Sequence, residues 1–177
     1  MAAHVEPGWL RRFVERMFLH GPAERIAGTV YGTIVVLGVL AAGAESPSID
    51  AWELDVLMTG TVIVLWIAHV YAHGIAESVR AGAPLDEQSL HALARREISI
   101  VFAAIGPAIA LLLGAVGVLG DENAVWLALA VGLVTLALQG LRYARATALR
   151  GRETLAIVAV NVMLGLVIVG LKVWVEG

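Results

Sequence analysis

Residues 54–76 read LDVLMTGTVIVLWIAHVYAHGIA, and this stretch decides the class of fold. Asp55 is the only Asp, Glu, Lys or Arg residue in it. A helix needs about 20 mostly apolar residues to cross the hydrocarbon of a bilayer, and this stretch is long enough to do so. The stretch therefore predicts a transmembrane helix.

Four further apolar segments of similar length accompany it, at residues 26–44, 98–120, 124–141 and 155–175. The 177-residue chain is 59% hydrophobic and 15% charged. A soluble domain has roughly 45–50% apolar and about 25% charged residues. The sequence thus predicts an all-α polytopic membrane protein, with a five-helix transmembrane domain over residues 21–177. Pro107, inside the third segment, predicts a kink there.

Basic residues predict the orientation, because the cytoplasmic loops of membrane proteins carry an excess of Lys and Arg. Eleven of the 12 Lys and Arg residues fall on one side of the predicted spans: Arg11, Arg12, Arg16, Arg25, Arg80, Arg95, Arg96, Arg142, Arg145, Arg150 and Arg152. The other side carries Lys172 together with seven acids: Glu45, Asp50, Glu53, Asp55, Asp121, Glu122 and Glu176. We therefore expect a multi-pass protein of the cell (inner) membrane, with its N-terminus in the cytoplasm and its C-terminus outside.

Residues 1–20 have a different pattern, with apolar residues at helical spacing and charged residues between them. The apolar positions are Trp9, Leu10, Phe13, Val14, Met17 and Phe18. The pattern predicts an amphipathic helix lying on the inner leaflet, although a basic amphipathic segment can also bind a partner protein.

Ionisable side chains inside a membrane are costly, so each one suggests a function. His69, His73 and Glu77 follow one another at intervals of four and share one face of a helix. Two histidines so spaced can chelate one metal ion, and Glu77 would add a carboxylate. Glu97, and either Glu24 or His20 near the start of the first span, could approach at a similar depth. The alternative is structural: the histidines hydrogen-bond to neighbouring helices, and Glu77 pairs with an arginine.

Laid out in this way, the whole chain resembles the vacuolar iron transporter family. The resemblance rests on Gly28 and Gly32 in the first span, on residues 70–79 (VYAHGIAESV) at the end of the second, and on Gly106-Pro107 in the third. It implies a five-span fold and a homodimer whose transport pathway lies between protomers, lined by Tyr31 and Tyr71.

This chain departs from the family at the metal-handling positions, where Tyr31, Tyr71 and Ile75 stand in place of an aspartate, a methionine and a glutamate. The family's iron site does not carry over to these positions. His69, His73, Glu77 and Glu97, with the two tyrosines, are the pathway residues we expect instead.

Three functions remain open from the sequence. The first is cation or proton-coupled transport, with a divalent metal ion as cargo. The second is a non-transporting scaffold that binds a cytoplasmic or membrane protein partner. A membrane enzyme with a metal at the two histidines ranks well behind, so we expect no enzymatic activity. No nucleic-acid-binding motif occurs, and the absence of cysteine excludes thiolate chemistry.

Overall fold

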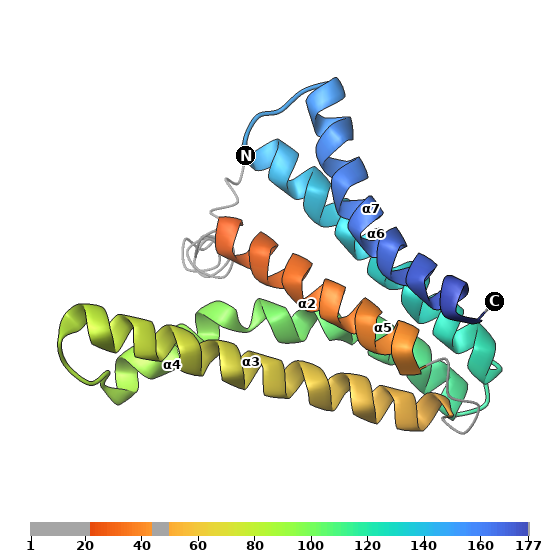
Figure 1. Cartoon of the computed structure of the whole chain (residues 1–177), viewed down its shortest axis with the longest axis horizontal. Helices are drawn as coiled ribbons and strands as arrows, with labels where there is room; N and C mark the ends of the chain where they lie inside the picture. The colour runs from red at the N-terminus through yellow and green to blue at the C-terminus, as the bar shows by residue number, and fades with distance from the viewer. Residues whose placement is uncertain (1–21, 44–49, 177) are drawn as a thin grey trace, which may run out of the picture.

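The computed structural model describes residues 22–43 and 50–176, and all regular structure in this part of the chain is helical. The helices are α2 (Pro22–Gly43), α3 (Ala51–Ala81), α4 (Glu87–Glu97), α5 (Ser99–Ala115), α6 (Asp121–Ala146) and α7 (Arg152–Glu176), as Figure 1 shows. The all-helical prediction is confirmed. The amphipathic helix predicted over residues 1–20 lies outside the described residues.

Four of these helices, α2, α3, α6 and α7, are long and apolar enough to cross a membrane. They coincide with the first, second, fourth and fifth predicted spans, so the membrane class of the fold is supported. The third predicted span, residues 98–120, has a different form. Helix α5 has 17 residues, about 25 Å of helix, and the hydrocarbon core is about 30 Å thick. A fifth crossing would therefore need α4 and α5 together.

Helices α4 and α5 meet at Ile98 with a bend of 42°. The bend follows from the sequence, because α4 is polar and α5 is almost entirely apolar. The two helices therefore suit different environments, and the polar one leaves the axis of the apolar one. Pro107, where the sequence predicted a kink, lies within the continuous helix α5.

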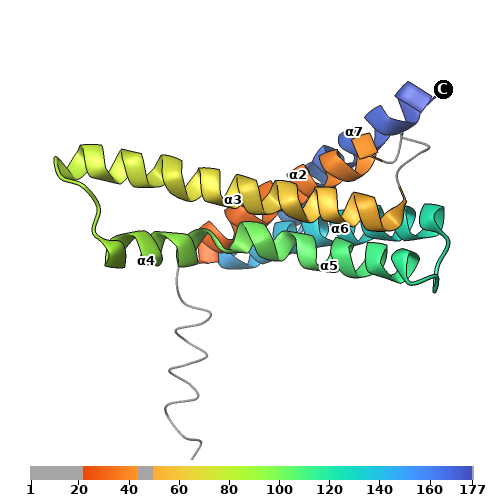
Figure 2. The ribbon, with the colours of Figure 1, turned by 90° about the horizontal axis from the view of Figure 1, so that it is seen from below.

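The turn between α3 and α4 brings α4 back along α3. Gly82 ends α3 in the left-handed conformation, with φ of 65°, which glycine adopts without steric cost. Asp86 then begins α4, because its carboxylate accepts a hydrogen bond of 2.9 Å from the Ser89 backbone N–H. In Figure 2, α4 and α5 run side by side with α3 in the opposite direction.

Helix α2 is central and contacts α3, α5, α6 and α7. Its approach to α5 depends on Gly32, since a Cβ atom there would lie 2.6 Å from the Ile100 carbonyl oxygen. The buried core residues gather around α2 and include Val36, Leu37, Leu40, Leu54, Met58, Ile100, Leu111, Leu129 and Leu136.

The described arginines gather at one end of the bundle, where acidic residues also occur. The start of α2, the end of α3, the end of α6 and the start of α7 lie at one end (Figure 1). This end carries the described arginines Arg25, Arg80, Arg95, Arg96, Arg142, Arg145, Arg150 and Arg152. We call it the basic end. The opposite end, where α3 and α6 begin, carries Asp50, Glu53, Asp55, Asp121 and Glu122, and we call it the acidic end.

Candidate functional site

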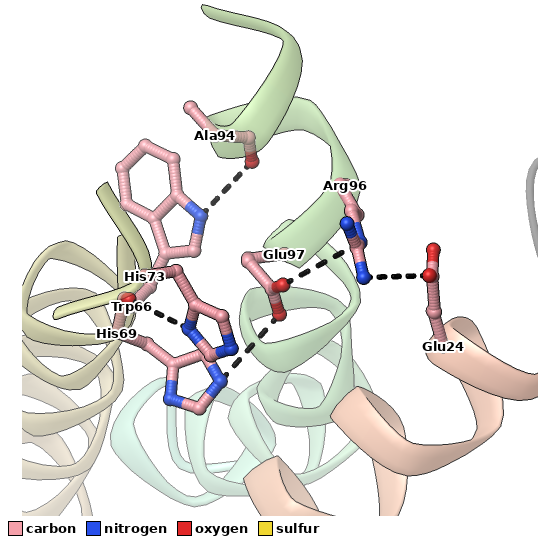
Figure 3. A network of polar contacts seen from close by, with 7 residues as sticks. All are labelled: Glu24, Trp66, His69, His73, Ala94, Arg96 and Glu97. Carbon is pink, nitrogen blue, oxygen red and sulfur yellow. Dashed lines mark hydrogen bonds and ion pairs between the residues drawn. The ribbon is translucent and has the colours of Figure 1, made fainter. Parts of the chain in front are cut away.

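Two imidazoles and one carboxylate meet where α4 ends against α3, toward the basic end. His69 and His73 lie one turn apart on α3, and Glu97 is the last residue of α4. One ligand atom from each lies within 4.8 Å of the other two. His69 Nε2 lies 3.6 Å from Glu97 Oε2 (Figure 3). We call these three residues the His–His–Glu cluster.

A backbone hydrogen bond sets the orientation of the His73 ring. Its Nδ1 lies 3.1 Å from the His69 carbonyl oxygen, which can only accept, so Nδ1 carries the proton and donates. The neutral imidazole then has its lone pair on Nε2. Figure 3 shows this second nitrogen on the side of the ring that faces Glu97. The His73 tautomer is thus the one that offers a lone pair to the cluster.

Ring contacts extend the cluster toward the surface. The His69 and His73 ring centroids are 4.5 Å apart, and the Tyr31 ring of α2 lies 5.6 Å from the His69 ring. The His69 side chain is 32% exposed and Tyr31 is 42% exposed. The cluster is therefore reached from the surface beside Tyr31 and is not sealed inside the bundle.

Glu97 is held between an imidazole and a guanidinium. It is 9% exposed, and its Oε1 lies 3.9 Å from Arg96 Nε, while Oε2 faces His69. Arg96 in turn forms a 2.6 Å ion pair with Glu24 of α2. Because two carboxylates share one guanidinium, the group of Glu24, Arg96 and Glu97 bears a net negative charge while both histidines are neutral.

A tryptophan fastens α4 to α3 at this level. Trp66 Nε1 of α3 donates a 3.2 Å hydrogen bond to the Ala94 carbonyl oxygen in the last turn of α4 (Figure 3). The last carbonyls of a helix lack partners within it. This bond therefore satisfies such a group and fixes the position of Glu97, three residues further on.

The structure brings together some of the residues predicted from the sequence and separates others. His69, His73 and Glu97 form the cluster, with Tyr31 beside it. Glu77 is not in it, since it lies two turns beyond His69, about 12 Å along the α3 axis. Tyr71 is 69% exposed and faces a separate apolar pocket.

That pocket lies between α3 and α4 and has a volume of about 360 Å³. Its lining residues are Trp66, Ile67, Val70, Tyr71, Leu90, His91 and Ala94. The sequence did not predict the pocket, nor the pairing of Arg96 with Glu24 and of Trp66 with Ala94. All three arise from the return of α4 along α3, which depends on tertiary packing.

The described residues define a class, an all-helical protein with four or five helices long and apolar enough to span a membrane and a cluster of two imidazoles and one carboxylate between α3 and α4. No protein-family model, no curated protein and no solved structure matches the chain.

Proposed function

We propose that this protein binds a divalent first-row transition-metal cation at His69, His73 and Glu97 and carries it across the membrane. The convergence of the three ligand atoms within 4.8 Å supports this proposal. Ionisable residues within membrane helices commonly mark ion pathways. The resemblance of the sequence to the vacuolar iron transporter family is a second reason for proposing transport.

The donor atoms suit such a cation. Two imidazole nitrogens and one carboxylate oxygen are ligands typical of Zn²⁺, Fe²⁺ and related ions, and harder ions such as Ca²⁺ prefer all-oxygen sites. Three protein ligands leave coordination positions for water, as suits a cargo that must be released.

Binding requires a small contraction of the cluster. Tetrahedral ligands at about 2.05 Å from a metal lie about 3.3 Å from one another. The 3.6 Å between His69 Nε2 and Glu97 Oε2 is close to this value. The widest separation in the cluster must shrink by up to about 1.5 Å, which side-chain rotation can provide.

The expected homodimer is part of the proposal. Tyr31 on α2 is exposed beside the cluster, so a second copy seated there would cover the route to His69. Such a dimer would place the cluster at an interface between protomers. The mass of the protein in detergent, measured by light scattering with the detergent subtracted, should then correspond to two chains.

Metal titration of the purified full chain tests the binding step. Zn²⁺ or Mn²⁺ should bind at one site per chain, and the double variant His69→Ala with His73→Ala should lose this binding. His91→Ala is the matched control, since His91 makes the same kind of hydrogen bond, 2.9 Å from Nδ1 to the Glu87 carbonyl, but lies outside the cluster. Equal loss in the control and the double variant would refute the assignment.

One observation favours a second function. The His69–Glu97 contact and the Arg96–Glu24 ion pair together join α2, α3 and α4, as a purely structural network would. In that case the protein is a non-transporting scaffold that binds a partner through its basic end. Recovery of a stoichiometric partner from native membranes, together with no metal flux in liposomes, would favour this function.

A further inference from the structure

A second ionisable group is buried near the acidic end, away from the His–His–Glu cluster. Asp55 lies one turn into α3 and is 8% exposed. Its Oδ1 atom is fully buried and has no hydrogen-bond partner among the described residues. Thr59, one turn further along α3, forms a hydrogen bond with the carboxyl group. An unpaired carboxylate oxygen in such a place is costly, whereas an unpaired oxygen of a neutral acid costs much less.

The helices around Asp55 bring no cation to it. Helix α3 packs against α2, α4, α5 and α6. Near Asp55, the start of α3, the end of α5 and the start of α6 converge, since a Cβ atom on Gly114 would lie 2.9 Å from Ala51 Cβ and 2.6 Å from Ala124 Cβ. Helix α5 has no ionisable side chain, and the half of α2 toward this end has none. Helix α4 lies at the other end of α3.

The charged groups of these helices near Asp55 are all acidic. They are Asp50 and Glu53 on α3 and Asp121 and Glu122 in the first turn of α6. Nearby negative charges disfavour ionisation of a carboxyl group, as does burial. The positive end of the α3 dipole acts mainly within the first turn, and Asp55 follows that turn.

We propose that Asp55 is a proton-binding site, holding its proton while α3, α5 and α6 are packed together as in this structure. Separation of these helices at the acidic end would admit water to the carboxyl group. The O–H bond would then break, with the proton passing to water and the carboxylate remaining on α3. Proton release is thereby tied to opening of this end of the bundle.

Asp55 also has a place in the transport proposed above, and this part of the inference rests on that proposal. It lies 14 residues from His69, which places the two side chains about 21 Å apart along α3 and within about 40° of the same face. One helix thus carries an ionisable group near each end of the bundle. Opening of the acidic end to release a cation would also release the Asp55 proton.

Infrared spectroscopy of the purified full chain at neutral pH tests the proton site. The wild-type protein should show the C=O stretch of a protonated carboxyl group, and Asp55→Asn should lose one group's intensity per chain. Glu53→Gln, an exposed acid on the same turn, should keep the full band. A wild-type spectrum without the band, or an unchanged band in Asp55→Asn, would overturn the proposal. If Asp55→Asn does not fold, ¹³C labelling of aspartate carboxyls in the wild type should shift the same band, and an unshifted band would exclude aspartate.

The transport role is tested separately in liposomes. Asp55→Asn should bind metal at His69 and His73 as the wild type does, but its metal flux should no longer respond to a pH gradient. A retained response would remove Asp55 from the transport cycle. If the wild type moves no metal at all, transport itself fails, and the infrared result still decides whether Asp55 holds a proton.

Discussion

Replacement of Glu97 by glutamine should weaken metal binding strongly, whereas the same replacement at Glu77 should not. Glutamine keeps the shape of the side chain and removes its negative charge. Glu97 contributes the oxygen that lies 3.6 Å from His69 Nε2, and Glu77 lies outside the cluster. The pair of variants therefore asks which carboxylate serves as a ligand.

The expected loss can be bounded. Removal of a group that merely supports a metal ligand costs about 10–100-fold in affinity, so the loss of a ligand itself should reach at least the upper part of that range. A 100-fold loss corresponds to about 2.8 kcal/mol. Coulomb's law makes this a lower bound, because a carboxylate bound to a divalent cation interacts more strongly than two unit charges about 4 Å apart, which already interact by about 1–4 kcal/mol between water-like and surface-like dielectric constants.

Isothermal titration calorimetry with Zn²⁺ on both variants and the wild type, in the same detergent, measures the effect. Glu97→Gln should raise Kd by about 100-fold or more, and Glu77→Gln should change it by less than about threefold. The reasoning is refuted if Glu77→Gln loses affinity and Glu97→Gln keeps it. That result would mean that Glu77, one turn beyond His73 on α3, is the metal ligand and that Glu97 of α4 is not.

Three further predictions concern the scaffold. Gly32→Ala should destabilise the bundle by about 1–3 kcal/mol, because the added methyl group overpacks against α5. Gly38→Ala, whose added methyl group would meet no atom within 4 Å, should be neutral or stabilising by at most about 1 kcal/mol. Thermal unfolding in detergent compares the two variants, and equal effects would contradict the packing argument. Trp66→Phe should remove the hydrogen bond to the Ala94 carbonyl and lower the free energy of unfolding by about 1 kcal/mol. Amide hydrogen exchange at the end of α4 should become faster. Unchanged exchange there would show that this bond does not hold α4 against α3. Hydrogen bonds from the Ser89 side chain and backbone N–H hold the pKa of the Asp86 carboxyl below its usual range. This cap therefore stabilises α4 fully at a pH above the usual range, and the stabilisation is lost as the pH falls through the lowered pKa. Asp86→Asn keeps a capping oxygen that does not titrate, so amide exchange at the start of α4 should no longer accelerate in acid, and an acceleration like that of the wild type would assign the effect to another group.

Local sequence predicted most of the helical fold, because length and hydropathy are enough to define an apolar helix. The third span is the exception. Its hydropathy extends across residues 98–120, but the helix itself ends at Ala115. The polar residues before Ile98 form a separate helix that bends away. Average hydropathy does not report the caps and turns that decide where a helix begins and ends.

The candidate site was predictable in part. The spacing of His69 and His73 places them on one face of any helix, so their proximity needed no tertiary information. Identifying the carboxylate beside the two histidines did require tertiary information. Glu77 was favoured by its spacing, yet Glu97 approaches the histidines because the turn at Gly82 returns α4 along α3. From the sequence, Asp55 was only the one charged residue at the outer start of the second predicted span, and its burial appears only once α5 and α6 are packed against α3.

Metal uptake into liposomes that contain the purified full chain is the most direct test of the proposed transport. A fluorescent reporter inside the vesicles should record entry of Mn²⁺ or Fe²⁺ through the wild type. The double variant His69→Ala with His73→Ala should reduce that flux to the level of empty vesicles, and His91→Ala should leave it unchanged. Flux that persists in the double variant would contradict the site, and the absence of flux through the wild type would contradict transport itself.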